Sequence, residues 1–221
     1  MMLNNYLSIF GNYEERIKTA ILALRLRRGI ILIDNHNREN EGDLVFSCEN
    51  MTIKQMALTI RYGSGIVCLC ITEKKRKQLK LPMMVQDNTS TYNTGFTVSI
   101  ESAHGISTGV SARDRLKTIK QAIPETAKPS DFNKPGHVFP VCAHVGGILS
   151  RPGHTEASIA LMSLSGFKPM SVICELTNKD GSMAKIKDII KFSKLNHMPI
   201  LTIDDLISYF KNKNVLLDYL N

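Results

Sequence analysis

Residues 38–43 read Arg-Glu-Asn-Glu-Gly-Asp and place three carboxylates at alternate positions, Glu39, Glu41 and Asp43. Side chains at alternate positions of an extended chain point to the same face. Three anions on one face repel one another unless a positive group lies among them. A hard divalent cation such as magnesium or manganese binds through one or two carboxylates together with the substrate. The motif therefore predicts a metal site, and an acidic surface loop is the equally supported alternative from this pattern alone.

A second group of reactive residues reads Ser-Arg-Pro-Gly-His-Thr-Glu at 150–156. Thr155 is a suitable N-cap, so we expect a helix to begin there with His154 just before it. The free backbone N–H groups of that end, the helix dipole and Arg151 then form an anion site, and the geometry of arginine suits a phosphate. A structural cap beside a surface arginine is the competing interpretation, and it is the commoner one for such a pattern by itself.

The segment 105–114, Gly-Ile-Ser-Thr-Gly-Val-Ser-Ala-Arg-Asp, is another glycine- and hydroxyl-rich approach to a helix, with Ser111 as its expected cap. Such loops bring backbone and hydroxyl groups close to a phosphate. A purely structural cap is again the competing interpretation. The sequence holds no Walker motif, so nothing in it indicates a nucleoside triphosphate site.

Two histidines and one glutamate stand out by their positions. His137 and His154 each follow Pro-Gly at the start of an expected element, where functional side chains are often held. Glu175 lies inside the apolar run Val-Ile-Cys-Glu-Leu-Thr, and a carboxylate in a buried strand is costly unless it is paired or its pKa is raised. A raised pKa is also what a general acid or base needs. The alternative for Glu175 is a solvated strand face.

Length and composition limit the class of protein. The chain has 221 residues, of which 43% are hydrophobic and 22% charged, as in an ordinary globular protein of one large or two small domains. No apolar run approaches the ~18–20 residues of a membrane span, and the N-terminus has no secretory pattern, so we expect a cytoplasmic protein. Five cysteines, an odd number without a C-x-x-C pair, indicate neither a disulfide framework nor a zinc site.

The net charge of +8 makes a nucleic-acid-binding module the non-enzymatic alternative. The basic residues are scattered apart from one cluster at 74–80, and no aromatic residues alternate with that cluster as a base-stacking surface requires. We therefore expect the cluster to be a solvated helix face. The patterned acids of 38–43 also argue against nucleic acid, because they repel phosphates unless a metal intervenes.

Helix and strand patterns alternate along the chain, which is typical of α/β layering. Helices are expected over 13–28, from Thr52, from Ser111, over 155–164, over 184–195 and from Asp204. Strands are expected over 30–34, 65–72, 94–100, 137–142, 171–177 and 198–203, with a surface loop at 124–136. Because the order is mixed, the predicted fold is of the α/β (α+β) class, a single three-layer α/β/α domain with a mixed, twisted β-sheet.

Five motifs occur in one order along the chain. They are R-E-N-E-G-D at 38–43, G-F-T-V-S-I with S-T-G-V-S-A-x-D-R at 95–115, G-H-V-F-P at 136–140, R-P-G-H-T-E-A at 151–157 and C-E-L-T at 174–177. Together they resemble the 3,4-dihydroxy-2-butanone 4-phosphate synthase family of riboflavin biosynthesis. The resemblance covers roughly residues 10–210. No single motif is sufficient, but their common order is specific.

The resemblance implies a lyase that converts D-ribulose 5-phosphate to L-3,4-dihydroxy-2-butanone 4-phosphate and formate. It implies magnesium or manganese, with two ions per site, and no organic cofactor. It also implies a homodimer whose sites lie near the subunit interface, with no nucleic-acid or membrane partner. One domain over residues 1–221 is expected, without a fused GTP cyclohydrolase II domain. The alternative enzyme is a metal-dependent sugar-phosphate aldolase or isomerase, which releases no formate.

The resemblance also assigns roles to single residues of these motifs. It implies Glu39 and His154 as metal ligands. It implies His137 and Glu175 as the groups essential for proton transfer, with Glu41 of the acidic loop as a further catalytic residue. The residues that it implies in binding of the substrate and its phosphate are Arg38, Glu39, Asp43, Thr108, Arg151, Pro152, Gly153, His154, Thr155 and Glu175.

The sequence departs from the family pattern in two places. The family often carries further acids just before 38–43, whereas Asn35, His36 and Asn37 stand there in this chain. The change lowers the local negative charge, which weakens the attraction for a metal but spares the three carboxylates. The segment Ala-His-Val-Gly-Gly at 143–147 is also unusual for the family, and no role is assigned to His144.

Overall fold

One mixed β-sheet organises residues 6–213, which the computed structural model describes. Its strands are β1 (Ile30–Ile33), β2 (Gly42–Ser47), β3 (Cys68–Ile71), β4 (Ile100–Ser102), β5 (Phe132–Cys142), β6 (Ser171–Glu175) and β7 (Ile200–Thr202). Their order across the sheet is β4-β5-β3-β6-β2-β1-β7. β3 runs parallel to β5 and β1 parallel to β7, whereas the other neighbours are antiparallel. The predicted mixed sheet is confirmed.

Helices and strands alternate along most of residues 6–213. The helices are η1 (Ser8–Phe10), α2 (Tyr13–Arg25), α3 (Ile53–Tyr62), α4 (Glu73–Gln78), α5 (Ala112–Ala122), η2 (Pro129–Asp131), α6 (Gly147–Ser150), α7 (His154–Leu164), α8 (Ile186–Asn196) and α9 (Ile203–Lys213). The expected helix starts at Thr52 and Ser111 are confirmed, because both side chains accept hydrogen bonds from the third backbone N–H of α3 and α5.

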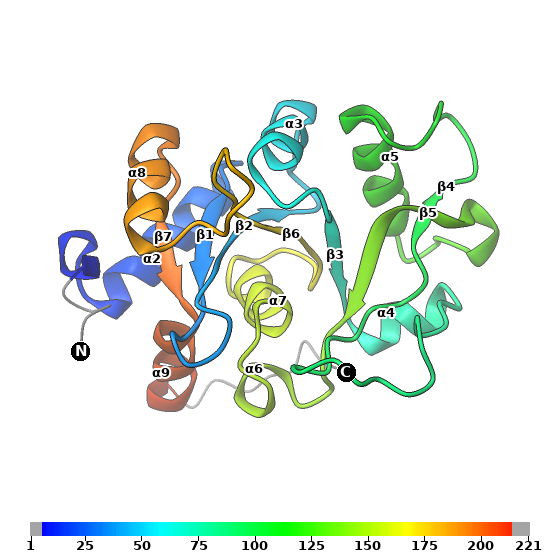
Figure 1. Ribbon diagram of the computed structural model, residues 1–221. Coiled ribbons are helices and arrows are strands. Elements are labelled where there is room, and N and C mark those ends of the chain that lie inside the picture. Colours follow the sequence, from blue (N-terminus) through cyan, green and yellow to red (C-terminus); the bar gives the residue numbers. More distant parts are fainter. Residues whose placement is uncertain (1–5, 214–221) are drawn as a thin grey trace.

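The sheet separates two apolar layers, as strand β1 illustrates. Ile31 and Ile33 belong to the core that includes residues of α3, α5 and α8, whereas Ile30 and Leu32 belong to the core that includes residues of α2, α7 and α9. Alternate side chains point to opposite faces, so β1 is apolar throughout because both faces are covered. Figure 1 shows α3, α5 and α8 on one side of the strands and α7 and α9 on the other. The predicted three-layer α/β/α architecture is confirmed.

Helix α7 is the most deeply buried element of its layer. Every residue from His154 to Met162 is buried, and the helix contacts β1, β2, β3 and β6. A helix buried on all sides gains its stability from packing rather than from solvated polar pairs. The sheet therefore fixes the position of its first turn, where His154 lies.

The packing of α7 can be tested at Leu161, which is fully buried. Replacement by alanine leaves a cavity, so Leu161→Ala should lower the free energy of unfolding by about 2–5 kcal/mol. The matched control is Leu195→Ala on α8, where the side chain is 70% exposed and the expected change is within about 0.5 kcal/mol. Urea denaturation of both variants measures the difference, and equal losses would contradict the assigned burial.

One strand was not predicted, and two predicted elements differ from the structure. The unpredicted strand is β2, a short strand that begins with Gly42 and carries Asp43. The predicted loop 124–136 is wrong in its second half, because β5 begins at Phe132. Its prolines and glycine suggest a loop, but the β4–β5 ladder shifts register at this place, where a strand tolerates such residues. The predicted strand 94–100 is reduced to isolated bridges and β4.

Two local predictions about polar residues are also wrong. Gly153, not Thr155, is the N-cap of α7, so His154 is the first helical residue and is buried instead of lying outside the helix. The basic cluster on α4 is not fully solvated, because Lys75 is buried and its Nζ donates to the carbonyl of Pro124 at 3.0 Å. Lysine lies in such a place by burying its aliphatic stem and directing the ammonium group to an acceptor.

Two further observations concern the membrane and the cysteines. None of the helices in residues 6–213 has the length and apolar composition needed to cross a membrane. All five cysteines are free thiols. The ends of the predicted 1–221 domain, residues 1–5 and 214–221, lie outside the described residues.

Candidate active site

A pocket of about 110 Å³ opens beside the first turn of α7, among residues of β2, β3, β5 and β6. The predicted site residues that line it are Arg38, Glu39, Glu41, Asp43, Arg151, His154, Thr155 and Glu175. Pro152 and Gly153 connect Arg151 to α7 without lining the pocket, and Thr108 and His137 lie elsewhere. The structure therefore brings most of the predicted site together from distant parts of the chain.

The turn between β1 and β2 is built around the buried carboxylate of Asp34. Oδ2 of Asp34 accepts from the backbone N–H of Glu39, and Oδ1 accepts from that of Glu41, each at 2.9 Å. Arg38 donates to Oδ2 at 3.1 Å. Asn40 has a φ of 54°, so the chain bends between the two glutamates. They therefore reach the pocket from a turn, and the predicted extended geometry is wrong for both.

Asp43 and His154 face each other with side-chain atoms that have no hydrogen-bond partner among the described residues. Nε2 of His154 lies 3.6 Å from Oδ1 of Asp43, and both atoms are buried without a hydrogen-bond partner among the described residues. Nδ1 of His154 lies 3.3 Å from Oε2 of Glu39, and ligand atoms of Asp34, Glu39 and His154 all lie within 4.8 Å of one another. Buried polar atoms are almost always paired. Imidazole nitrogens and carboxylate oxygens in this arrangement fit a divalent cation.

The pKa values of two glutamates in the turn, Glu39 and Glu41, are shifted in opposite directions. Burial opposes the ionised form of Glu39, but His154 and Arg38 hold the pKa of that carboxyl below its ordinary value. Burial, Glu39 and Glu175 raise the pKa of Glu41. Neighbouring carboxyl groups whose pKa values are separated in this way suit different roles. Glu39 suits a cation, whereas Glu41 suits a group that holds and releases a proton.

The buried pair Asp43 and His154 is also strongly perturbed. Burial, together with the neighbouring carboxylates, raises the pKa of Asp43 to about 8 although His154 opposes the shift. Burial by itself lowers the pKa of His154, but Asp43, Glu39 and Asp34 outweigh it and raise that pKa to about 9. Arg38 and His154 are thus the positive groups that lie among the carboxylates of the 38–43 motif.

Glu175 lies at the end of β6, where its register partner in β2 is Asp43. The side chain is partly buried and accepts a hydrogen bond from Oγ of Ser64 at 2.5 Å. The prediction that this carboxylate needs a partner is therefore met by a serine from the segment after α3. From this strand end the side chain of Glu175 lines the same pocket as Glu39 and His154.

Two arginines flank the pocket and both contact Tyr92. The guanidinium of Arg38 lies 4.7 Å from the centre of the Tyr92 ring, and the tyrosine hydroxyl donates to the carbonyl of Arg38 at 2.7 Å. Arg151 donates through Nη2 to the carbonyl of Tyr92 at 2.9 Å. The first N–H groups of α7, beginning at His154, have no partner within the helix. Guanidinium groups beside a helix start form a site for a phosphate.

His137 belongs to a separate polar cluster beside the start of α5, and Thr108 directly precedes Gly109 of that cluster. Nδ1 of His137 lies 2.9 Å from Oε2 of Glu101, and the histidine side chain is 45% exposed. Gly109, with a φ of 80°, packs against this pair, because a Cβ there would lie 2.3 Å from Oε2 of Glu101. Asp114 fixes the turn by accepting from the backbone of Gly109 at 3.2 Å. Within one chain these residues and the pocket are not brought together.

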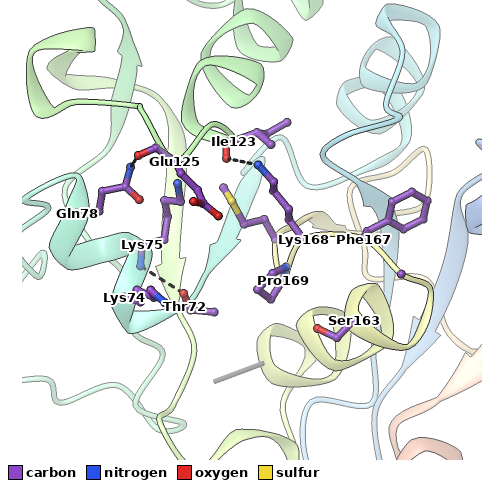
Figure 2. A pocket seen from close by; sticks show the side chains of 12 residues that line it. Thr72, Lys74, Lys75, Gln78, Ile123, Glu125, Ser163, Phe167, Lys168 and Pro169 are labelled. Atoms are coloured by element: carbon purple, nitrogen blue, oxygen red, sulfur yellow. Dashed lines mark hydrogen bonds between the residues drawn. The ribbon is translucent and has the colours of Figure 1, made fainter. Parts of the chain in front are cut away.

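A larger cavity, of about 780 Å³, lies at the C-terminal end of α7. Figure 2 shows Lys168 of its lining directed at the carbonyl of Ile123, to which Nζ donates at 3.4 Å. Lys75 donates in the same way to the carbonyl of Pro124. These ammonium groups satisfy the carbonyls that follow α5. With Glu125 as the one carboxylate of its lining, this cavity lacks the acid–base and metal-ligand groups of the smaller pocket.

Four residues that support the pocket were not predicted from the sequence. They are Asp34, Ser64, Tyr92 and Glu156. Asp34 follows an apolar strand directly, and an acid at such a strand end is a usable signal. Glu156 lies inside a quoted motif, but its role depends on contacts that the sequence does not show. Ser64 and Tyr92 come from loops and give no sequence signal.

Replacing Asp34 by asparagine tests the support of the 34–41 turn. The amide can accept only at one oxygen, so one of the two glutamate N–H groups loses its partner. Outer residues that orient metal ligands typically change metal affinity by about 10–100-fold when replaced. We expect Asp34→Asn to weaken manganese binding by that factor, measured by calorimetry. Unchanged affinity would show that the turn holds its shape without this carboxylate.

Comparison with known proteins gives a consistent result. Residues 18–209 match the family described as 3,4-dihydroxy-2-butanone 4-phosphate synthase. The chain is 68% identical over 215 residues to the protein of that name from Buchnera aphidicola subsp. Acyrthosiphon pisum (strain Tuc7), an alignment that covers 97% of this chain and 100% of the relative. It is 60% identical over 208 residues to that of Cronobacter sakazakii (strain ATCC BAA-894), covering 94% and 96%.

Solved structures agree with the sequence relatives. A 3,4-dihydroxy-2-butanone 4-phosphate synthase described as a complex with two magnesium ions matches with a TM-score of 0.85 and 33% identity, over 90% of this chain and 97% of that one. The Candida albicans synthase matches with a TM-score of 0.80 and 39% identity, over 88% and 96%. Since the family match spans most of the chain and the relatives align over nearly their full length, the chain belongs to the 3,4-dihydroxy-2-butanone 4-phosphate synthase family.

Proposed function

We propose that the pocket beside α7 is the active site at which this lyase of riboflavin biosynthesis converts D-ribulose 5-phosphate to L-3,4-dihydroxy-2-butanone 4-phosphate and formate. The observation that carries the assignment to this pocket is that two buried atoms that face each other, Asp43 Oδ1 and His154 Nε2, have no hydrogen-bond partner among the described residues and lie beside Glu39. A metal-dependent reaction of a sugar phosphate needs such a donor set together with an anion site. The arginines and the start of α7 supply the anion site.

Glu39 and His154 hold magnesium or manganese in this proposal, with two ions per site. When bound, the metal supplies a Lewis acid that stabilises negative charge developing on substrate oxygens. α7 fixes His154, and the hydrogen bonds to Asp34 fix Glu39, so both ligands are oriented in advance. His154 binds a metal as the neutral imidazole, so it releases the proton that the surrounding carboxylates favour.

The remaining pocket residues move protons and orient the substrate. The reaction removes a proton beside a carbonyl, expels a hydroxyl, shifts the carbon skeleton and releases one carbon. Glu41, whose pKa is raised, holds a proton between such steps. Glu175 lines the same pocket from β6 and also transfers protons there. Arg38, Arg151 and Thr155 anchor the phosphate, which fixes the reacting carbons relative to these acids.

We further propose a homodimer in which the partner supplies His137 and Thr108 to this pocket. Thr108 is exposed and His137 is partly exposed in one chain, and neither lines the pocket beside α7, although the family resemblance gives both a part in the reaction. Apolar side chains at Met83, Met84 and Val85 are between 40% and 52% exposed, which suits an interface between copies. A two-fold dimer then has two equivalent sites.

The sheet with its two apolar layers supports one catalytic domain across the chain, and we place the enzyme in the cytoplasm. Five free thiols are usual in a reducing compartment. The acids of the pocket repel nucleic-acid phosphates, so the substrate is a small molecule.

Carbon NMR of purified protein with D-ribulose 5-phosphate tests the function. We expect formate and the four-carbon product in the presence of magnesium and neither after its removal by a chelator. Consumption of the substrate without formate would instead identify an aldolase or isomerase that uses the same pocket. Unchanged substrate under both conditions would reject the assignment.

A further inference from the structure

Glu156 is a buried carboxylate to which the reaction described above gives no part. The residue is 1% exposed and lies in the first turn of α7, two positions after His154. Oε1 accepts from the backbone N–H of His144 at 2.8 Å, and Oε2 accepts from Nη1 of Arg151 at 2.7 Å. A buried carboxylate is costly unless its oxygens are paired. Glu156 therefore has a specific partner in a residue of the pocket.

The backbone beside this pair leaves room for it. Gly153 is the N-cap of α7, and a Cβ built there would lie 2.5 Å from Nη1 of Arg151 and 2.8 Å from Oε2 of Glu156. Its φ of −107° is open to any residue, so the glycine is needed here for space and not for backbone conformation. Any side chain at this position must displace the arginine from the carboxylate.

The opposite edge of the same guanidinium is also held. Nε and Nη2 of Arg151 donate to the carbonyl of Tyr92 at 3.3 and 2.9 Å. Tyr92 in turn contacts Arg38 through its ring and its hydroxyl. An arginine held at both edges keeps one orientation, whereas a free arginine loses side-chain conformational entropy when it binds an anion.

We propose that Glu156 is a positioning residue that sets the orientation of Arg151 for the phosphate of the substrate. It touches neither the substrate nor the metal in this role and acts through Arg151 alone. The proposal rests on the proposed function of the pocket, because Arg151 is the phosphate-binding group in it. Loss of Glu156 should weaken binding of the phosphate group more than it slows the chemical steps.

The test compares Glu156→Gln, Arg151→Ala and the double variant. The amide keeps an acceptor for His144 but removes the charge that holds the guanidinium. A charge-assisted hydrogen bond is worth enough to change affinity about tenfold. We expect Glu156→Gln to raise KM for D-ribulose 5-phosphate about tenfold while kcat changes less than about threefold. In the Arg151→Ala background the same substitution should change KM less than about twofold, because partners in one network are not additive.

Asp205→Asn is the matched control, since Asp205 forms another buried pair with an arginine, Arg16, at 2.6 Å and away from the pocket. It should lower the melting temperature and leave KM unchanged. If Glu156→Gln behaves like this control, the carboxylate is merely structural and the proposal is overturned. Gly153→Ala is the second variant if Glu156→Gln does not fold, because its Cβ displaces the guanidinium while both partners remain.

Calorimetry with inorganic phosphate separates this proposal from the proposed function. If the wild type releases no formate, the proposed function fails, and the phosphate affinities alone decide the role of Glu156. A wild type that releases formate, with equal phosphate affinity and KM in Glu156→Gln, overturns the positioning role and leaves the function intact. A parallel loss of phosphate affinity and rise in KM supports both.

Discussion

Replacing Glu39 by glutamine should reduce the rate of formate release by about a thousandfold at saturating magnesium. A metal that stabilises developing charge contributes several kcal/mol, and each 1.4 kcal/mol corresponds to a factor of ten. The amide has nearly the same shape and stays neutral, so it cannot supply the ionised oxygen that His154 and Arg38 maintain at Glu39. Glu39 is only partly buried, and glutamine nearly keeps its shape, so the melting temperature should stay close to that of the wild type. Formate is measured by NMR, and manganese affinity by calorimetry should fall in parallel.

A glutamate on the protein surface provides the control for this experiment. Glu14 pairs with Lys213 at 3.5 Å and lies on α2, outside the pocket lining. Glu14→Gln should turn over at the wild-type rate, because exposed ion pairs contribute little. Wild-type metal affinity in Glu39→Gln would mean that the 38–43 motif is an acidic turn without a cation, and Asp43 with His154 would then need another explanation.

The class of fold follows from the sequence because its signals are local. Apolar strands such as 30–34 and amphipathic helices such as the one from Thr52 carry their periodicity in consecutive residues. The prediction fails where the deciding interaction is distant. β5 extends to Phe132 because β4 and α5 cover that segment. The residues near Pro135 do not indicate that β4 will pair with them.

The candidate site shows the same division between local and distant information. Motifs identify the residue types that line the pocket, and eight of the predicted residues meet there. The sequence places Glu39 and Glu41 on an extended face, whereas a buried Asp34 bends the chain and aims both. Glu156 illustrates the limit, because a glutamate in the first turn of a helix is ordinary until its contact with Arg151 is known.

A heterodimer of two inactive variants should recover about half of the wild-type activity if the partner completes the site. His137→Ala and Glu175→Gln are expected to be inactive as homodimers. In a dimer of one chain of each kind, one site combines the intact Glu175 of one chain with the intact His137 of the other, and the second site carries both defects. Two-fold symmetry gives two sites per dimer, so one of two remains active. Chains with different affinity tags allow the heterodimer to be purified and assayed for formate.

The matched heterodimer combines Glu39→Gln with Glu175→Gln. These residues line the same pocket of one chain, so each site of that heterodimer carries one defect, and it should stay inactive. Activity in the first heterodimer and not in the second requires that His137 acts across the interface. Only then does the first heterodimer contain one site without a defect, whereas every site of the second carries one. If both heterodimers are inactive, His137 serves the pocket of its own chain, and His137 on β5 must then come closer to α7 when substrate binds than it lies in this structure.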